Sequence, residues 1–194
     1  MPPKAKFTKE DIIKAAIELT RKSGVASVTA RALAERLGTS VKPIFGLFSG
    51  MEELKKDILD TANKIYQSFL ANEMASGQYP PYKASGIGYI KFAREEKELF
   101  KLLFMRDRSG ESITEDRESI RPIIDIVKKN TGFSDDTAYR FHLEQWIFVH
   151  GIASMIATNY ILWTDEDISR SVSRVYNGLK TEYEAEMKNN ELCN

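Results

Sequence analysis

Few side chains in this 194-residue sequence have the types and spacing that a chemical reaction requires. Its two histidines, His142 and His150, lie in one apolar segment, and Glu144 stands where a helix would point it away from His142. The single cysteine, Cys193, cannot build a disulfide framework or a zinc site. No Gly-x-Ser-x-Gly, Walker or His-Glu-x-x-His motif is present. We therefore predict that the protein is not an enzyme and has no catalytic residue, metal site or cofactor.

Positive charge is concentrated near the N-terminus. Residues 1–48 carry nine Lys and Arg against four Asp and Glu, whereas the rest of the chain carries 19 against 24. A basic segment on an acidic body favours an anionic partner such as nucleic acid for that segment. The alternative is that these are ordinary solvated charges.

The composition is that of a globular protein, with 42% hydrophobic and 29% charged residues. No apolar run approaches the roughly 20 residues that a membrane span needs. The first residues are basic but no apolar stretch follows them, so they do not form a secretory signal. We predict a cytoplasmic protein with no membrane partner.

Helical periodicity dominates the first quarter of the chain. Thr8 can cap a first helix that Gly24 ends, and Thr29 can cap a second helix over residues 30–37. Ser49 and Glu52 have the spacing of a capping box for a fourth, long helix running to about Glu73.

The stretch GTSVKPIFGLF, residues 38–48, follows the second helix and predicts a short third one. Helix, glycine turn and short helix form the helix-turn-helix pattern, with Gly38 in the left-handed turn position. Ile44 and Leu47 would be buried. With Ser40 as cap, Pro43 falls in the first turn, where a missing N–H costs little; the helix could also begin at Pro43 itself.

This arrangement over residues 8–56 resembles the N-terminal domain of TetR-type transcriptional regulators. The resemblance implies that the third helix reads the major groove of DNA and that the second helix contacts its backbone. The DNA-contacting residues that it implies are Thr29, Arg31, Ser40, Val41, Lys42, Pro43, Phe45 and Gly46. QWIFVHGIA, residues 145–153, is similar to a Trp…His-Gly signature in the C-terminal domain of one TetR subgroup.

The sequence departs from the family pattern at positions that matter for DNA. Phe45 and Gly46 stand where the family usually has Tyr and a polar or aromatic residue, and Met51 stands where it usually has Lys. Two phosphate contacts would therefore be missing. Thr20 stands where an aromatic residue is usual, which would leave the head's core slightly underpacked.

The rest of the sequence also predicts helices. SGQYPPYKASG, residues 76–86, is the clear interruption, and we expect further helices at 84–95, 96–106, 117–130, 134–163 and 165–188. The fold class is thus all-α with about nine helices. Residues 1–50 would form the helix-turn-helix DNA-binding domain, and residues 51–194 a ligand-binding and dimerisation domain.

In the second domain we expect an apolar ligand pocket and a dimer interface. Trp146 and His150 share a helix face, either as a pocket wall with a polar handle or simply as a packed helix with Gly151 at a close approach. The pocket candidates are Phe92, Phe104, Ile124, Phe141, Gln145, Trp146 and Phe148. The interface candidates are Ile147, Met155, Ile156, Val172, Val175 and Leu179.

Together these expectations describe a TetR-like regulator, most simply a repressor. It would bind a pseudo-palindromic DNA operator as a homodimer and leave it when a small-molecule effector binds. The alternative is a helical ligand-binding or protein-interaction module whose DNA binding is weak or lost, as Phe45, Gly46 and Met51 suggest.

Overall fold

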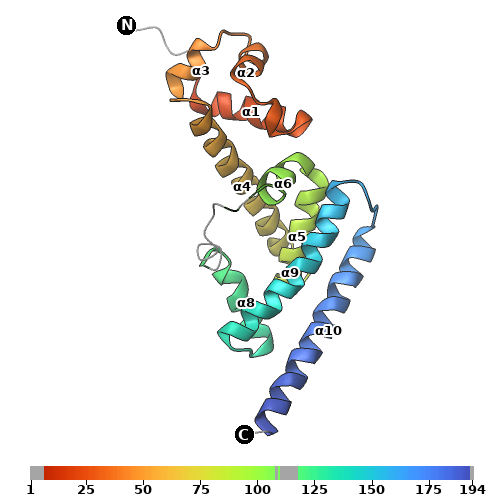
Figure 1. The fold of residues 1–194 in the computed structure, drawn as a ribbon. Helices are drawn as coiled ribbons and strands as arrows, with labels where there is room; N and C mark the ends of the chain where they lie inside the picture. Colours follow the sequence, from red (N-terminus) through yellow and green to blue (C-terminus); the bar gives the residue numbers. More distant parts are fainter. Residues whose placement is uncertain (1–6, 108, 110–117, 193–194) are drawn as a thin grey trace. The chain divides into compact units, whose positions relative to one another are not determined.

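The computed structural model describes residues 7–107, 109 and 118–192. Within these residues the secondary structure is entirely helical, with nine α-helices and one 3-10 turn (Figure 1). This confirms the all-α prediction. The elements are α1 (Lys9–Ser23), η1 (Val25–Ser27), α2 (Ala30–Arg36), α3 (Lys42–Leu47), α4 (Met51–Ala75), α5 (Pro81–Glu95), α6 (Lys97–Phe104), α8 (Arg121–Thr131), α9 (Asp135–Ala157) and α10 (Asp165–Leu192).

The chain divides into two compact units. Unit 1 comprises Met1–Ser68 and Glu95–Arg106, and unit 2 comprises Phe69–Arg94 and Asp107–Asn194. The first residues of α4 therefore belong to unit 1 and its last residues to unit 2. Helix α6 belongs to unit 1, together with the N-terminal helices. The predicted functional division at residue 50 stays a prediction. Cys193 lies outside the described residues, and no helix in the described part is long and apolar enough to cross a bilayer.

Helix α1 begins with the capping box that the sequence predicts. The Thr8 hydroxyl accepts from the Asp11 N–H at 3.1 Å, and the Asp11 carboxylate accepts from the Thr8 N–H at 2.9 Å. The hydrogen bond from the Thr8 N–H, together with one from the Thr8 hydroxyl to the same carboxylate, lowers the pKa of Asp11. The helix ends at Gly24, whose φ of 77° lies in the region that favours glycine.

Helix α6 packs on α1 within unit 1. The Arg21 guanidinium donates two hydrogen bonds to the Glu96 carboxylate, at 2.8 and 2.6 Å, and only 14% of the Glu96 side chain is exposed. Leu99 and Phe100 of α6 are fully buried. The α1–α6 contact thus combines a paired charge with apolar burial.

Helix α4 begins at Met51, but its cap differs from the prediction. The Ser49 N–H and hydroxyl donate to Glu53, at 2.7 and 2.8 Å, whereas Glu52 pairs with Lys55. Glu53 also accepts from Lys9 at 2.5 Å, and the hydrogen bonds from Lys9 and Ser49 lower its pKa to about 2. Glu53 thus joins the start of α4 to α1.

Two predicted boundaries in unit 2 are wrong. Helix α5 begins at Pro81 rather than near residue 84, because proline is well tolerated at the first helical position. Helix α9 ends at Ala157 rather than near residue 163. Asn159 takes a left-handed φ of 58°, and the Tyr160 N–H then donates back to the Met155 carbonyl at 2.8 Å.

Helices α4 and α5 approach closely in unit 2. A Cβ on Gly88 would lie 3.0 Å from the Phe69 carbonyl oxygen and 3.2 Å from the Leu70 Cα. The rings of Phe69 and Phe92 meet edge to face beside this point, with centroids 5.5 Å apart. A side chain at position 88 would therefore need the neighbouring α4 backbone to move by a few tenths of an ångström.

The core of unit 2 gathers around Phe141 of α9. Its fully buried ring contacts four other aromatic rings, with centroids 5.3 to 6.3 Å apart. The partners come from α5, from the segment between α8 and α9, and from α10, which runs alongside α9 (Figure 1). They are Tyr82, Phe133, Tyr176 and Tyr183.

Both histidines of α9 are engaged by tyrosines of α5. The Tyr82 hydroxyl lies 3.0 Å from His142 Nδ1, and the Tyr89 hydroxyl lies 2.8 Å from His150 Nδ1. Burial lowers the pKa of His142 from its usual 6.5 to about 4 and also lowers the pKa of His150. Both histidines are therefore neutral in the folded protein at pH 7.

Replacing Gly88 by Ala should destabilise unit 2. The new methyl group would force the α4 backbone away, which typically costs about 1–3 kcal/mol. Gly86→Ala is the matched control, because its Cβ would meet only Val149 Cγ2 at an ordinary 3.5 Å and gains about 1 kcal/mol of helix propensity. Urea unfolding followed by the fluorescence of Trp146 and Trp163, both in unit 2, measures the difference. Equal midpoints for the two variants would contradict the close approach.

Lowering the pH from 7 to 4.5 should weaken unit 2 through His142. The unfolded chain binds a proton near pH 6.5 and the folded chain only near pH 4, so unfolding becomes more favourable as the pH falls through this window. The loss between pH 7 and pH 4.5 is on the order of 2 kcal/mol. His142→Gln keeps a hydrogen-bonding group for Tyr82 but cannot gain the charge. The same fluorescence assay should show a smaller loss for this variant, and equal losses would refute the role of His142.

Candidate nucleic-acid interface and ligand pocket

The turn between α2 and α3 has the geometry that the sequence predicts. Thr29 caps α2 by accepting a hydrogen bond from the Ala32 N–H at 3.1 Å. After α2, Gly38 adopts a φ of 61°, and the Thr39 N–H donates to the Ala34 carbonyl at 2.9 Å. Ala34 itself is buried. A left-handed glycine therefore turns the chain and lets α3 follow α2 immediately.

The start of α3 differs from the predicted one. Ser40 is not the cap: the residue before the helix is Val41, which is itself helical and makes no side-chain capping bond. Lys42 is the first helical residue and Pro43 the second. Proline is accommodated here because the first N–H groups of a helix lack intrahelical partners in any case.

Helix α3 has one buried and one exposed face. Ile44 and the following Phe48 are 1% and 2% exposed and pack into the core of unit 1. On the other face, Val41 and Phe45 are 40% and 49% exposed. We call the exposed residues of this stretch the reading face: Ser40, Val41, Lys42, Phe45 and Gly46. Pro43 is half-buried beside it.

Two cations near this face are available to an external partner. Arg31, in the first turn of α2, and Lys42 are exposed, and neither forms an ion pair within the described residues. Several other cations of unit 1 are paired, as Lys9 is with Glu53, Arg21 with Glu96 and Arg36 with Glu18. A Cβ on Gly46 would meet no atom within 4 Å, so the surface is open there. The arrangement offers two positive charges beside an exposed apolar surface.

The seven predicted pocket residues are divided between the two units. Phe104 belongs to unit 1, where its ring contacts Tyr66 at 5.1 Å and Phe100 at 5.4 Å, while the other six belong to unit 2. Phe92, Ile124 and Phe141 are buried in packed core, and Phe148 is half-buried.

Trp146 stacks on the face of the His150 ring, with centroids 5.0 Å apart, while the ring nitrogens lie 2.8 Å from the Tyr89 hydroxyl and 3.3 Å from the Ser154 hydroxyl. This favours the packed-helix reading of the pair. Gln145 is buried, donates a long 3.4 Å hydrogen bond to the Val172 carbonyl, and leaves its Oε1 without a partner among the described residues.

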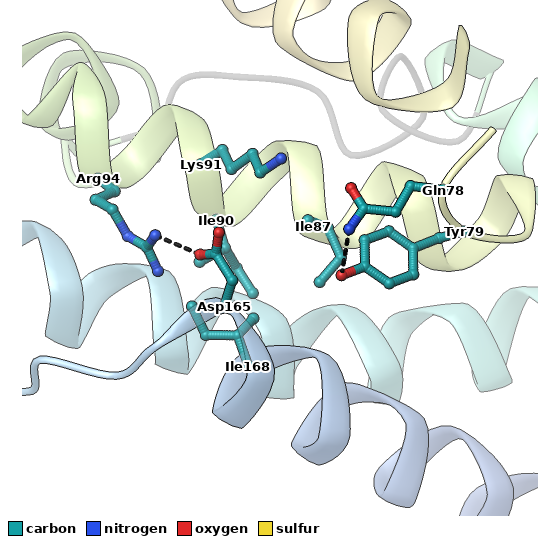
Figure 2. Close-up of a pocket in the computed structure, with 8 residues that line it drawn as sticks. All are labelled: Gln78, Tyr79, Ile87, Ile90, Lys91, Arg94, Asp165 and Ile168. Atoms are coloured by element: carbon teal, nitrogen blue, oxygen red, sulfur yellow. Dashed lines mark hydrogen bonds and ion pairs between the residues drawn. The ribbon is translucent and has the colours of Figure 1, made fainter. Parts of the chain in front are cut away.

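A pocket does occur in unit 2, between α5, the residues before it and the start of α10 (Figure 2). Its cavity volume is only about 20 Å³, room for about one water molecule. The lining residues are Gln78, Tyr79, Ile87, Ile90, Lys91, Arg94, Asp165 and Ile168. None of these residues was predicted to line a pocket. Gln78 and Tyr79 lie in a segment whose sequence predicts a loop, and the charged residues have the pattern of solvated surface. The one available signal was the pair of cations Lys91 and Arg94 on a helix that is otherwise mostly apolar.

The predicted interface residues divide by exposure. Ile147 and Met155 are 58% and 44% exposed, Val175 and Leu179 are half-buried, and Ile156 and Val172 are buried within unit 2. Leu143 is also exposed, and Gly151 has open space where a Cβ would be. Residues 143, 147, 151 and 155 follow at four-residue spacing and so form one stripe along α9, which we call the α9 stripe.

Two protein families match this sequence. Residues 12–58 match the family described as bacterial regulatory proteins, tetR family. Residues 82–179, just over half of the chain, match a family described as tetracyclin repressor-like, C-terminal domain. No curated protein matches.

Solved structures share the fold at low sequence identity. A TetR-like transcriptional regulator from Rhodococcus sp. RHA1 is 14% identical, with a TM-score of 0.64 and coverage of 97% of this chain and 99% of that one. A TetR family member from Streptomyces coelicolor A3 is 15% identical, with a TM-score of 0.61 and coverage of 89% and 98%. A putative TetR family regulator from Vibrio parahaemolyticus is also 15% identical, with a TM-score of 0.60 and coverage of 88% and 97%.

Proposed function

Because the chain belongs to the TetR family of transcriptional regulators, we propose that it represses transcription by binding a pseudo-palindromic DNA operator as a homodimer. A small molecule bound in unit 2 would release the operator. The protein would act in the cytoplasm and catalyse no reaction. The observation that carries this proposal is the reading face, where Val41, Lys42 and Phe45 are exposed on a helix anchored from behind by Ile44 and Phe48.

The chemistry of the reading face suits the major groove. The apolar surface of Val41 and Phe45 matches thymine methyl groups, and Lys42 can donate to a guanine edge or to a phosphate. Thr29 and Arg31 would contact the backbone from the start of α2. Gly46 adds no side chain that would hold the DNA backbone away.

A homodimer would cover the α9 stripe. Three exposed apolar side chains lie along it, and Gly151 allows a facing helix to approach. A two-fold axis would pair this stripe with its copy, in the manner of helix-bundle dimers. Ile147 and Met155 would carry the contact, with Val175 and Leu179 of α10 at its side. Symmetric heads would then read half-sites whose centres lie about 34–36 Å apart, or a multiple of that.

Lys42→Ala should weaken operator binding, whereas Lys22→Ala, which removes an equal charge from exposed α1 surface, should weaken it less. The operator would first be selected from genomic DNA fragments, and affinities measured by fluorescence anisotropy at several salt concentrations. Met51→Lys should steepen the slope of log affinity against log salt by about 0.9 for each phosphate engaged. If the wild type prefers no operator at low salt and Lys42→Ala changes nothing, the helical binding-module alternative is correct.

Ile147→Glu should dissociate the dimer, because it places a charge at the centre of an apolar contact. Ile147→Leu keeps the apolar surface and is the control. Sedimentation velocity at micromolar concentration should show a dimer for the wild type and for Ile147→Leu, and a monomer for Ile147→Glu. A wild-type monomer under these conditions would refute the proposed assembly.

A further inference from the structure

We infer that the loop between α9 and α10 is a second part of the dimer interface, in which the loop of each copy packs against the other copy. This α9–α10 loop comprises residues 158–164 and joins the end of α9 to the start of α10 (Figure 1). The inference rests on the proposed function, because it extends the surface that we assign to the second protomer.

Two side chains of the loop lie almost entirely in solvent. Tyr160 is 79% exposed and Leu162 is 90% exposed, which makes them the most exposed of the large hydrophobic side chains in the described part of the chain. Trp163 beside them is 38% exposed, and Met155 near the end of α9 is 44% exposed. A single exposed apolar residue needs no explanation, but a group of them marks an interaction site.

The backbone of the loop is held firmly at its start. Asn159 takes a left-handed φ of 58° and turns the chain back on α9. The Met155 carbonyl then accepts hydrogen bonds from the Tyr160 N–H at 2.8 Å and from the Ile161 N–H at 3.4 Å. The exposed side chains therefore stand on a turn that is closed against the end of the helix.

The loop is also held at its far end. The Thr164 hydroxyl accepts from the Asp167 N–H and the Asp167 carboxylate accepts from the Thr164 N–H, each at 3.2 Å, which caps α10. Arg94 donates to the Trp163 carbonyl at 3.3 Å and pairs with Asp165 at 2.5 Å. A loop that is ordered before binding loses little conformational entropy when a partner covers it.

The α9 stripe alone is small for a stable dimer. It offers three exposed apolar side chains, whereas a stable interface typically buries about 800 Å² on each partner, over about 20–30 residues. Met155 is the last residue of the stripe and also the residue whose carbonyl holds the loop. The two surfaces are therefore continuous, and a second copy that covers the stripe reaches the loop next to it.

The charges around the loop favour a protein partner over an anionic one. Residues 158–167 contain three acidic residues and no basic residue. Nucleic acids and anionic membranes are bound chiefly through Lys and Arg. A second copy makes no such demand, and it brings an uncovered apolar surface of its own, the α9 stripe. In a two-fold dimer each copy then both gives and receives a loop.

Leu162→Ala tests the inference, and Leu162→Met, which keeps the apolar surface, is its control. Because Leu162 is 90% exposed in one protomer, its truncation should leave the fold intact, as thermal unfolding would verify. In the dimer the side chain is lost from both copies, so the dissociation constant should rise about 30-fold or more. Leu162→Met should keep most of the affinity. Sedimentation velocity with fluorescence detection, from nanomolar to micromolar protein, measures these constants.

Trp163 gives a second measurement that leaves Leu162 unchanged. The chain has two tryptophans, so Trp163 is the only one in a Trp146→Phe variant. Its emission should move to shorter wavelength, and acrylamide should quench it less, as the dimer forms and the loop leaves water. Emission and quenching that stay constant while sedimentation shows dimer formation would contradict the inference.

The outcomes separate this inference from the proposed function. If the wild type is a dimer and Leu162→Ala leaves its dissociation constant unchanged, the loop is not part of the interface, and the homodimer stands. The same holds if Leu162→Ala instead abolishes binding to phosphatidylcholine vesicles, which would identify a membrane surface as the partner. A wild-type monomer at micromolar concentration refutes the homodimer and the inference together, and fluorescence anisotropy with the operator then shows separately whether the chain binds DNA.

Discussion

The need to bury helix α9 organises unit 2. Its apolar residues spread over most of its circumference, so no single neighbour can cover it, and α5, α8 and α10 pack around it. Phe141 fills the centre of this arrangement, and the two tyrosine–histidine pairs fix α5 along it. What remains uncovered is the α9 stripe. The same constraint that builds the unit therefore leaves the surface that we assign to the second protomer.

Unit 1 meets a different constraint, because its functional surface must stay exposed. Helix α3 has six residues, too few for an isolated helix to be stable, so its stability depends on Ile44 and Phe48 in the core. Anchoring from one side allows Val41 and Phe45 to remain in solvent and allows a proline and a glycine within the helix. Pro43 and Gly46 lower helix propensity, but they are compatible with a helix that is held by packing and whose exposed face must contact another molecule.

The sequence predicted the elements better than it predicted the contacts between them. Thr8, Thr29 and Gly24 are local signals, and the helices begin and end beside them as expected. Besides misplaced helix ends, errors arose where a distant residue decides the outcome. Glu53 rather than Glu52 caps α4, and Lys9, far away in sequence, also binds it. Phe104 was assigned to the body because a pattern of apolar residues does not reveal which unit it joins. The pocket was not predicted because Arg94 and Asp165 lie 71 residues apart in the sequence. Nothing in the sequence shows that the fold brings these two opposite charges together.

The interleaving of the two units has a consequence for synthesis and for protein engineering. Unit 1 takes Met1–Ser68 first and α6 only later, after a segment that belongs to unit 2. On the ribosome, the N-terminal helices must wait for Leu99 and Phe100 to emerge before their core is complete. An excised fragment ending at residue 50 would lack these side chains and would expose the apolar surface that they cover. A chimaera that exchanges DNA-binding heads between relatives should therefore exchange residues 95–106 together with the N-terminal segment.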